Sequence, residues 1–232
     1  MSRSRAFSSL ALCLAALVPL PAISGTVMLT GIGGMANVPV KSLKELRFRN
    51  VVRQQYDFSC GSAALATLLT YHYQHPISEQ DAFKAMYETG DKEKIRKEGF
   101  SMLDMKRYLD NAGYPANGFR ASLDKLAEVG IPAIVLLNLN GYMHFVVVKG
   151  VSQKEVLVGD PASGLRSLPR SQFESSWNGI LFVINDPKDN MIARNSFNNQ
   201  AVWQQRSLAP LGLALSRDSL ATFSLLLGKH EL

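Results

Sequence analysis

Cys60 has the residue type and the position of a nucleophile. It opens the segment Cys60–Tyr73, which is rich in Ala and Leu and predicts a helix with an apolar face. Free backbone N–H groups and the positive end of the helix dipole favour a negative charge at a helix N-terminus, so a thiolate would be stabilised there. Gly61 leaves room for the backbone of a substrate to approach. This position favours a reactive cysteine over a buried, inert one.

A thiolate mechanism also needs a proton acceptor, and the chain has four histidines: His72, His75, His144 and His230. His72 lies roughly 18 Å from Cys60 along the helix at about 1.5 Å per residue, and His75 lies beyond it. Both are expected to be solvated helix-end residues, and no third ligand is evident for a metal site built on this pair. His230 lies near the C-terminus. His144 interrupts the apolar run Tyr142–Val148 and is the candidate general base, the alternative being a core histidine with its hydrogen bonds satisfied.

Asp160 is the carboxylate that makes His144 the better candidate. Strands at 145–149 and 155–158, joined by a turn near Ser152, would form a hairpin, and this pairing places residues 144 and 160 near the same end. A carboxylate beside an imidazole fixes its tautomer and stabilises the imidazolium. Cys60, His144 and Asp160 therefore form a candidate set of nucleophile, base and orienting group.

A side-chain amide shortly before the cysteine could stabilise an oxyanion. Gln54 precedes Cys60 by six residues, and Gln55 is the neighbouring candidate. Together with the backbone N–H of Cys60, such an amide could hold the negative charge that develops on a carbonyl oxygen, at about 3 kcal/mol per donor.

The elements that must position these groups change in character along the chain. Helices are expected first, at 60–73, 78–88, 102–111 and 122–130, with Ser59, Ser78, Ser101 and Ser122 as N-caps. Strands are expected next, at 132–139, 142–150, 155–158 and 179–184, with a short helix at 171–177. Asn140-Gly141 predicts a hairpin turn between the first two strands. This order indicates an α+β fold, in which N-terminal helices pack on a C-terminal antiparallel sheet.

The ends of the chain are expected to lie outside this domain. Residues 1–24 have the basic start, apolar stretch and small cleavage-site residues of a secretory signal, and an uncleaved anchor is the alternative. Residues 25–49 are expected to form an extended arm, 50–185 the domain, and 186–232 a polar tail with two apolar patches. The signal predicts a periplasmic protein without a stable transmembrane segment after cleavage. Its removal also takes away Cys13 and leaves Cys60 as a single cysteine, which cannot form an internal disulfide.

The composition excludes some classes of function. Apolar residues make up 47% of the chain and charged residues 19%, which is typical of a soluble globular protein. Without the two arginines of the signal, 23 basic and 19 acidic residues remain. This excess is too diffuse to indicate nucleic-acid binding, because no basic run with interleaved aromatic residues accompanies it.

The segment Gln54–Leu65, QQYDFSCGSAAL, resembles the active-site opening of the bacteriocin-processing, papain-like cysteine peptidases. The pattern of that family is Gln, five residues, Cys-Gly, a small residue, Ala and an apolar helix, followed later by His and by Asp about sixteen residues further on. Here Gln54 precedes Cys60 by six, and Asp160 follows His144 by sixteen. The resemblance covers roughly residues 50–185.

This resemblance implies a papain-like fold and a cysteine endopeptidase that needs no metal or organic cofactor. It implies a polypeptide substrate, either a secreted protein or a leader peptide, and partners related to a secretion system or an ABC exporter. The chain lacks an exporter membrane domain and carries a predicted signal. In this it is similar to stand-alone members of the family in Gram-negative bacteria, one of which accompanies a functional-amyloid secretion system. The family usually has Asp directly before the cysteine, where this chain has Ser59, so double-glycine specificity does not follow.

Three other hypotheses fit parts of the same pattern. Degenerate relatives bind leader peptides without cutting them, although they have typically lost the cysteine that this chain keeps. A papain-like site can also transfer an acyl group to an amine instead of water. A purely structural component of a secretion system would not need Cys60 or His144 at all.

Overall fold

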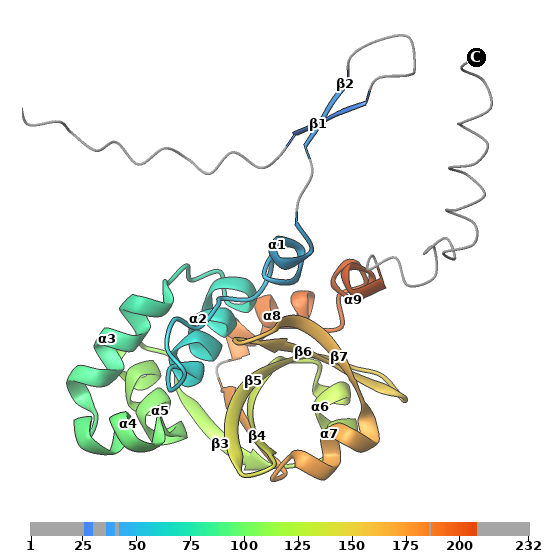
Figure 1. Ribbon diagram of the computed structural model, residues 1–232. Helices are drawn as coiled ribbons and strands as arrows, with labels where there is room; N and C mark the ends of the chain where they lie inside the picture. The colour runs from blue at the N-terminus through green and yellow to red at the C-terminus, as the bar shows by residue number, and fades with distance from the viewer. Residues whose placement is uncertain (1–25, 30–35, 40–41, 186, 208–232) are drawn as a thin grey trace, which may run out of the picture. The chain divides into compact units, whose positions relative to one another are not determined.

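The structure is a computed structural model, which describes residues 26–29, 36–39, 42–185 and 187–207 (Figure 1). The predicted signal and the two apolar patches of the predicted tail lie outside these residues. Residues up to Lys41 form one unit, and the chain from Ser42 onward forms a second. The described part of the first unit is an antiparallel hairpin of β1 (Thr26–Leu29) and β2 (Ala36–Pro39). The segment expected to be an extended arm therefore contains paired strands.

The helical layer of the second unit surrounds one buried helix. The helices are α1 (Leu43–Arg47), α2 (Cys60–His72), α3 (Glu79–Thr89), α4 (Lys92–Glu98) and α5 (Met102–Asn111). Every residue of α2 from Cys60 to Leu69 is buried, because small Ala and Gly side chains let α3, α5 and the sheet pack closely around it. Ser78 and Ser101 cap α3 and α5 as expected, and α4 was missed by the sequence pattern.

Six antiparallel strands form the sheet, in the order β3-β8-β4-β5-β6-β7. They are β3 (Ala116–Arg120), β4 (Ala133–Leu139), β5 (Tyr142–Val151), β6 (Glu155–Asp160), β7 (Gly164–Pro169) and β8 (Ile180–Ile184). Asn140 and Gly141 have positive φ values of 55° and 92°, which the β4–β5 hairpin turn requires. The four expected strands and this turn are confirmed, whereas β3 and β7 were not foreseen.

The sheet separates two hydrophobic clusters. Along β5, Phe145 and Val147 pack with α2, α3 and α5, while Val146 and Val148 face the opposite side. That second side is covered by α6 (Leu123–Val129) and α7 (Arg170–Ser176). Successive side chains of β5 point to opposite faces of the sheet, so the strand contributes buried side chains to both clusters. The fold is α+β, with the N-terminal helices packed on an antiparallel sheet, as the sequence predicts.

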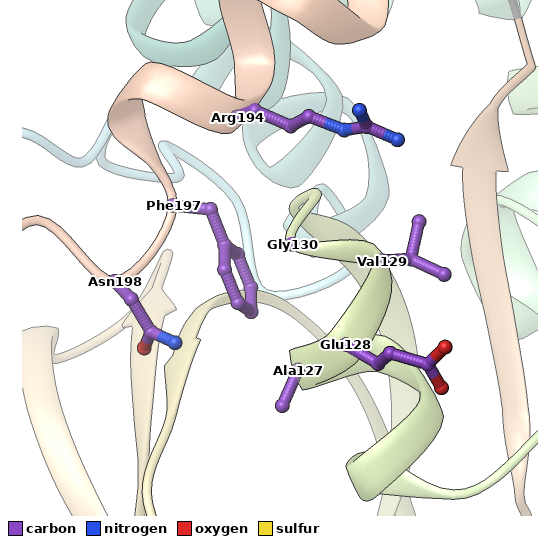
Figure 2. A pocket seen from close by; sticks show the side chains of 7 residues that line it. All are labelled: Ala127, Glu128, Val129, Gly130, Arg194, Phe197 and Asn198. Atoms are coloured by element: carbon purple, nitrogen blue, oxygen red, sulfur yellow. The ribbon is translucent and has the colours of Figure 1, made fainter.

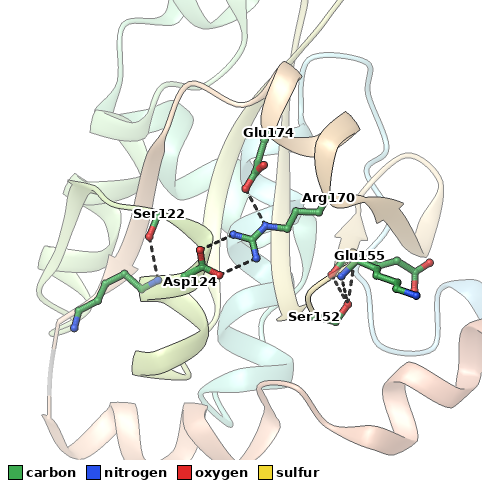
Figure 3. A network of polar contacts seen from close by, with 8 residues as sticks. Ser122, Asp124, Ser152, Glu155, Arg170 and Glu174 are labelled. Carbon is green, nitrogen blue, oxygen red and sulfur yellow. Dashed lines mark hydrogen bonds and ion pairs between the residues drawn. The ribbon is translucent and has the colours of Figure 1, made fainter.

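An exposed ion-pair network joins the two helices on this second face (Figure 3). The Arg170 guanidinium donates to both carboxylate oxygens of Asp124, at 2.8 and 2.9 Å, and to Glu174 at 2.9 Å. Ser122 caps α6 by accepting from the backbone N–H of Lys125 at 3.2 Å. These contacts fix α7 against α6 and involve none of the residues that the sequence singles out for chemistry.

Within residues 186–232, which are expected to be a polar tail, the structure describes two helices, α8 (Pro187–Ser196) and α9 (Gln200–Ser207). Val202 and Trp203 pack with Phe48, Val51 and neighbouring residues of β6 and β7. Asn50 also donates to the side chain of Gln205 at 3.1 Å. The Asn- and Gln-rich composition does not predict these helices, because only a few of their apolar side chains pack against the rest of the domain. No helix in the described part of the chain is long and apolar enough to cross a membrane.

Candidate active site

Cys60 is the first residue of α2, and its thiol is free and largely buried, with 6% of the residue exposed. Ser59 occupies the N-cap position, but its side chain does not cap the helix as expected. Its hydroxyl instead donates to the carbonyl of Tyr56 at 3.0 Å and accepts from the Tyr56 N–H at 3.2 Å. This local turn shapes the loop 54–59 and leaves the first N–H groups of α2 without a side-chain cap from Ser59.

His144 and Asp160 meet where β5 begins and β6 ends. The β5–β6 register pairs Val147 with Gly159, so the two side chains lie at the same end of the hairpin. The Nε2 atom of His144 and the Oδ1 atom of Asp160 are 2.8 Å apart, and the side chains are only 3% and 5% exposed. Asp160 also accepts hydrogen bonds from the Ala162 N–H at 2.8 Å and from the Ser163 hydroxyl at 2.7 Å. The carboxylate is therefore held rigidly beside the imidazole.

These contacts decide the charge of the pair. Burial by itself would lower the pKa of His144, but the hydrogen bond to Asp160 and the interaction with Cys60 outweigh it and raise this pKa to about 9. Burial would raise the pKa of Asp160, but the contacts with His144, Ser163 and the Ala162 N–H hold it well below its usual range. At neutral pH the imidazolium and the carboxylate are the favoured forms.

The second imidazole nitrogen is available to the thiol. Nδ1 of His144 is buried and has no hydrogen bond of regular geometry among the described residues. Cys60 is nevertheless close enough to contribute to the raised pKa of His144. With Nε2 engaged by Asp160, Nδ1 is the atom that can exchange a proton with the sulfur.

The structure separates the two candidate glutamines. The backbone N–H of Gln54 donates to the carbonyl of Pro161 at 3.0 Å, and its side-chain amide donates to Tyr56 at 3.1 Å. One amide N–H of Gln54 can donate to Tyr56 while the other remains for a further acceptor. Gln55 is exposed, and its side-chain oxygen accepts from Gln80 on α3 at 3.0 Å. Gln54 is thus the residue tied to the Asp160 end of the site.

Tyr142 is a neighbour that the sequence interpretation missed. Its ring stacks on that of His144, with centroids 5.7 Å apart and an interplanar angle of 26°. Its hydroxyl donates to the carbonyl of Asp57 at 2.9 Å. The two-residue spacing from His144 in a strand could have indicated this contact, because residues i and i+2 lie on the same face.

The other described histidines lie away from this set, and one expectation about them is wrong. His75 is exposed as predicted, but His72 is only 2% exposed, and its Nδ1 atom lies 2.6 Å from the Ser196 hydroxyl. Burial and, next, the charge of Lys149 lower the pKa of His72 well below 6.5, so it is neutral. The unforeseen helix α8 covers His72, which explains the difference. Within residues 26–29, 36–39, 42–185 and 187–207, no group of three or more His, Cys, Asp or Glu could hold a metal ion.

A hollow of about 430 Å³ lies elsewhere, between the end of α6 and the junction of α8 and α9 (Figure 2). Its lining includes the buried ring of Phe197 and the exposed charged side chains of Glu128 and Arg194. Cys60, His144 and Asp160 do not line it. The candidate nucleophile, base and orienting group therefore lie outside this hollow.

The chain is similar to known proteins over the segment that contains these residues. Residues 49–189 match the model of the peptidase C39 family. The chain is 42% identical over 175 residues to a probable functional amyloid protease, FapD, of Pseudomonas fluorescens, covering 75% of this chain and 77% of that protein. It is 43% identical over 170 residues to the FapD of Pseudomonas aeruginosa, covering 73% and 72%. The peptidase domain of Streptococcus ComA, a bifunctional ABC transporter, has a similar fold, with a TM-score of 0.51, 21% identity and coverage of 58% of this chain and 96% of that domain.

Proposed function

This chain belongs to the peptidase C39 family and is a cysteine peptidase, and on that premise we propose that it cuts a secreted or exported protein in the periplasm through Cys60, His144 and Asp160. The observation that carries the assignment of these residues is the buried pair of His144 and Asp160 beside a cysteine at the start of a helix. Such a pair holds a positive charge next to the sulfur, which favours the thiolate.

The mechanism follows from the roles of these groups. The Cys60 thiolate attacks the carbonyl carbon of the scissile peptide bond, and the carbonyl oxygen becomes an oxyanion. The side chain of Gln54 and the Cys60 backbone N–H donate to that oxygen. The imidazolium of His144 gives its proton to the leaving amine, and the C–N bond breaks to leave a thioester on Cys60. Water, deprotonated by His144, then hydrolyses the thioester and restores the thiolate, while Asp160 keeps the imidazole oriented.

The names of the relatives support an exported substrate. The two Pseudomonas relatives are named probable functional amyloid proteases. The lactococcin-G-processing and transport ATP-binding protein of Lactococcus lactis is 28% identical over 136 residues, which cover 57% of this chain and 18% of that protein. We infer that the substrate of this chain is an amyloid-forming secreted protein or the leader of an exported peptide. Residues 1–24 would direct export, 50–185 would form the peptidase domain, and 186–232 would extend it. Partners from the same secretion system are consistent with this role.

The alkylation of Cys60 tests the proposed site without any knowledge of the substrate. The rate with iodoacetamide is measured against pH for the purified mature protein and for His144→Ala. Fast alkylation at pH 5–6 that the substitution abolishes is the expected result, because only a thiolate paired with an imidazolium reacts at that pH. The matched control is His75→Ala, which removes an exposed histidine from the end of α2. A rate that rises only near the free-thiol pKa of about 8.5, equally in all three proteins, would refute the site.

A second assay separates cleavage from binding alone. The wild-type protein and Cys60→Ala are incubated with peptides that represent secreted proteins, and the products are identified by mass spectrometry. A peptidase yields two fragments with the mass of one added water, and Cys60→Ala yields none. A binding module would retain the peptide uncut in both proteins. An amine joined to the acyl fragment would instead identify transamidation.

A further inference from the structure

Tyr142 stands at a fixed point on the hairpin that carries the proposed base. It is the first residue of β5 and pairs with Leu139 across the two-residue turn. The positive φ of Asn140 and Gly141 and a 2.7 Å hydrogen bond from the Gly141 N–H to the Asn138 side chain define the turn. The backbone of Tyr142 is therefore held in place by the strand pairing and the turn.

The side chain of Tyr142 contacts both halves of the proposed site. Its ring lies against the ring of His144, with the centroids 5.7 Å apart. Its hydroxyl reaches the Asp57 carbonyl at 2.9 Å, in the middle of the loop 54–59. Tyr142 thus connects the strand of the base directly to the loop that precedes the nucleophile.

The hydroxyl is suited to remain a donor in this bridge. Burial and then the negative charges of Cys60, Asp57 and Asp160 raise the pKa of Tyr142. Since an ionised phenol cannot donate, the protonated form that makes the bond to Asp57 persists across the working pH range.

The loop 54–59 connects the two groups that the proposed mechanism uses for the oxyanion. Gln54 begins it and Cys60 follows it, so the side-chain amide and the backbone N–H donor lie at its two ends. Gln54 is held to Pro161, and Ser59 is held to Tyr56. Between these ends, Asp57 is exposed and its carbonyl is bonded to Tyr142.

We propose that Tyr142 is a positioning residue that clamps the loop 54–59 to the strand of His144 and so sets the oxyanion donors relative to the base. This inference rests on the proposed function of Cys60 and His144. Tyr142 itself takes no proton and forms no covalent bond in the reaction. The bond from its hydroxyl to Asp57 is therefore expected to affect the step that creates an oxyanion, and not the formation of the ion pair.

Two reactions of the same thiol separate these effects. Iodoacetamide alkylation creates no oxyanion, whereas acylation by p-nitrophenyl acetate does, releasing p-nitrophenolate as a burst and leaving an acetyl thioester on Cys60. We expect Tyr142→Phe, which keeps the ring and removes the bond to Asp57, to lower the burst rate roughly tenfold, the effect of about 1.4 kcal/mol. Its alkylation rate should follow the wild-type pH profile.

Two further variants complete the test. Tyr142→Leu removes the ring as well, and its alkylation at pH 5–6 should fall below that of Tyr142→Phe because the imidazole loses its packing. Tyr108→Phe on α5, a helix that carries none of the proposed site residues, is the matched control and should equal the wild type in both reactions. Thermal unfolding confirms that each variant is folded before its rates are compared.

The possible results separate the role of Tyr142 from the roles of Cys60 and His144. If the wild type shows alkylation that depends on His144 but Tyr142→Phe keeps the wild-type burst rate, the positioning role of Tyr142 is refuted. The proposed roles of Cys60 and His144 are then unaffected. If burst and alkylation fall together in Tyr142→Phe, the residue supports the ion pair and not the oxyanion donors, which also overturns the clamp. If wild-type alkylation does not depend on His144, both proposals fail.

Discussion

The backbone N–H of Gln54 donates a hydrogen bond to the carbonyl of Pro161 at 3.0 Å. Pro161 directly follows Asp160, so this bond joins the loop before the nucleophile to the turn that holds the carboxylate. Residues more than a hundred positions apart in the chain are thereby fixed next to each other. The proposed oxyanion donor and the group that orients the base consequently share one rigid frame.

Removal of the Gln54 side chain should slow acylation selectively. We expect Gln54→Ala to lower the p-nitrophenyl acetate burst rate by about 10²-fold to 10³-fold, the effect of losing one oxyanion donor. Its iodoacetamide alkylation should match the wild type, because that reaction has no oxyanion. Gln55→Ala is the matched control, since the neighbouring side chain is bonded to Gln80 instead. Equal burst rates in the two variants would assign the oxyanion to other donors.

Replacement of Asp160 should change the pH range of the ion pair. In Asp160→Asn the carboxylate no longer stabilises the imidazolium, so the pKa of His144 should fall from about 9. The rise in alkylation rate that His144 causes should then be lost at a lower pH in Asp160→Asn than in the wild type. The p-nitrophenyl acetate burst rate should also fall on the order of tenfold or more. Asp124→Asn removes an exposed carboxylate from the remote Arg170 network and should leave both measurements unchanged. A pH profile of Asp160→Asn identical to that of the wild type would contradict the assigned role.

The pKa shifts of His144 and Lys149 should change the free energy of unfolding with pH in opposite directions. The pKa of His144 in the folded protein is raised from 6.5 to about 9, so its stabilisation is complete below pH 6.5 and is lost as the pH rises to 9. Burial lowers the pKa of Lys149 from 10.5 to about 7. Between pH 7 and 10.5 the lysine is therefore protonated in the unfolded chain but not in the folded protein, so the free energy of unfolding rises with pH over this range. The two effects oppose each other between pH 7 and 9.

Urea unfolding of single variants at several pH values tests this opposition. Lys149→Met should lose stability steadily from pH 7 to 9, because only the His144 effect remains. His144→Gln should gain stability over the same range, because only the Lys149 effect remains. Parallel stability curves for the wild type and both variants would show that neither group has the shifted pKa.

Helix α9 should contribute to stability without contributing to chemistry. The indole of Trp203 packs near Val51, Leu157 and Leu165 and donates to Asn198 at 3.3 Å. Because the side chain is only partly buried, Trp203→Ala should cost about 1–2 kcal/mol, less than a fully buried Trp. Urea unfolding measures the loss, and Met191→Ala on α8, which is 69% exposed, is the control. A stability equal to that of the control would mean that α9 packing is energetically neutral.

Local chemistry explains why much of the fold could be predicted from the sequence. Serine caps fix the starts of α3 and α5, and Asn140-Gly141 fixes the turn between β4 and β5. The candidate set of Cys60, His144 and Asp160 followed from the expected helix start and hairpin. Elements with weak local patterns were missed, including β3, whose residues after Ala116 are all exposed. Helix α8 was taken for part of a tail for the same reason.

The sequence by itself determined that Cys60 opens a helix and that residues 144 and 160 lie near one end of a hairpin, since both depend on residues close together in the chain. Only the tertiary structure decided that Gln54 and not Gln55 lies by Asp160, that Tyr142 bridges to Asp57, and that His72 is buried beneath α8. These contacts join segments that are distant along the chain. Their partners depend on how the helical layer and the sheet pack together, and no local propensity or spacing contains that information.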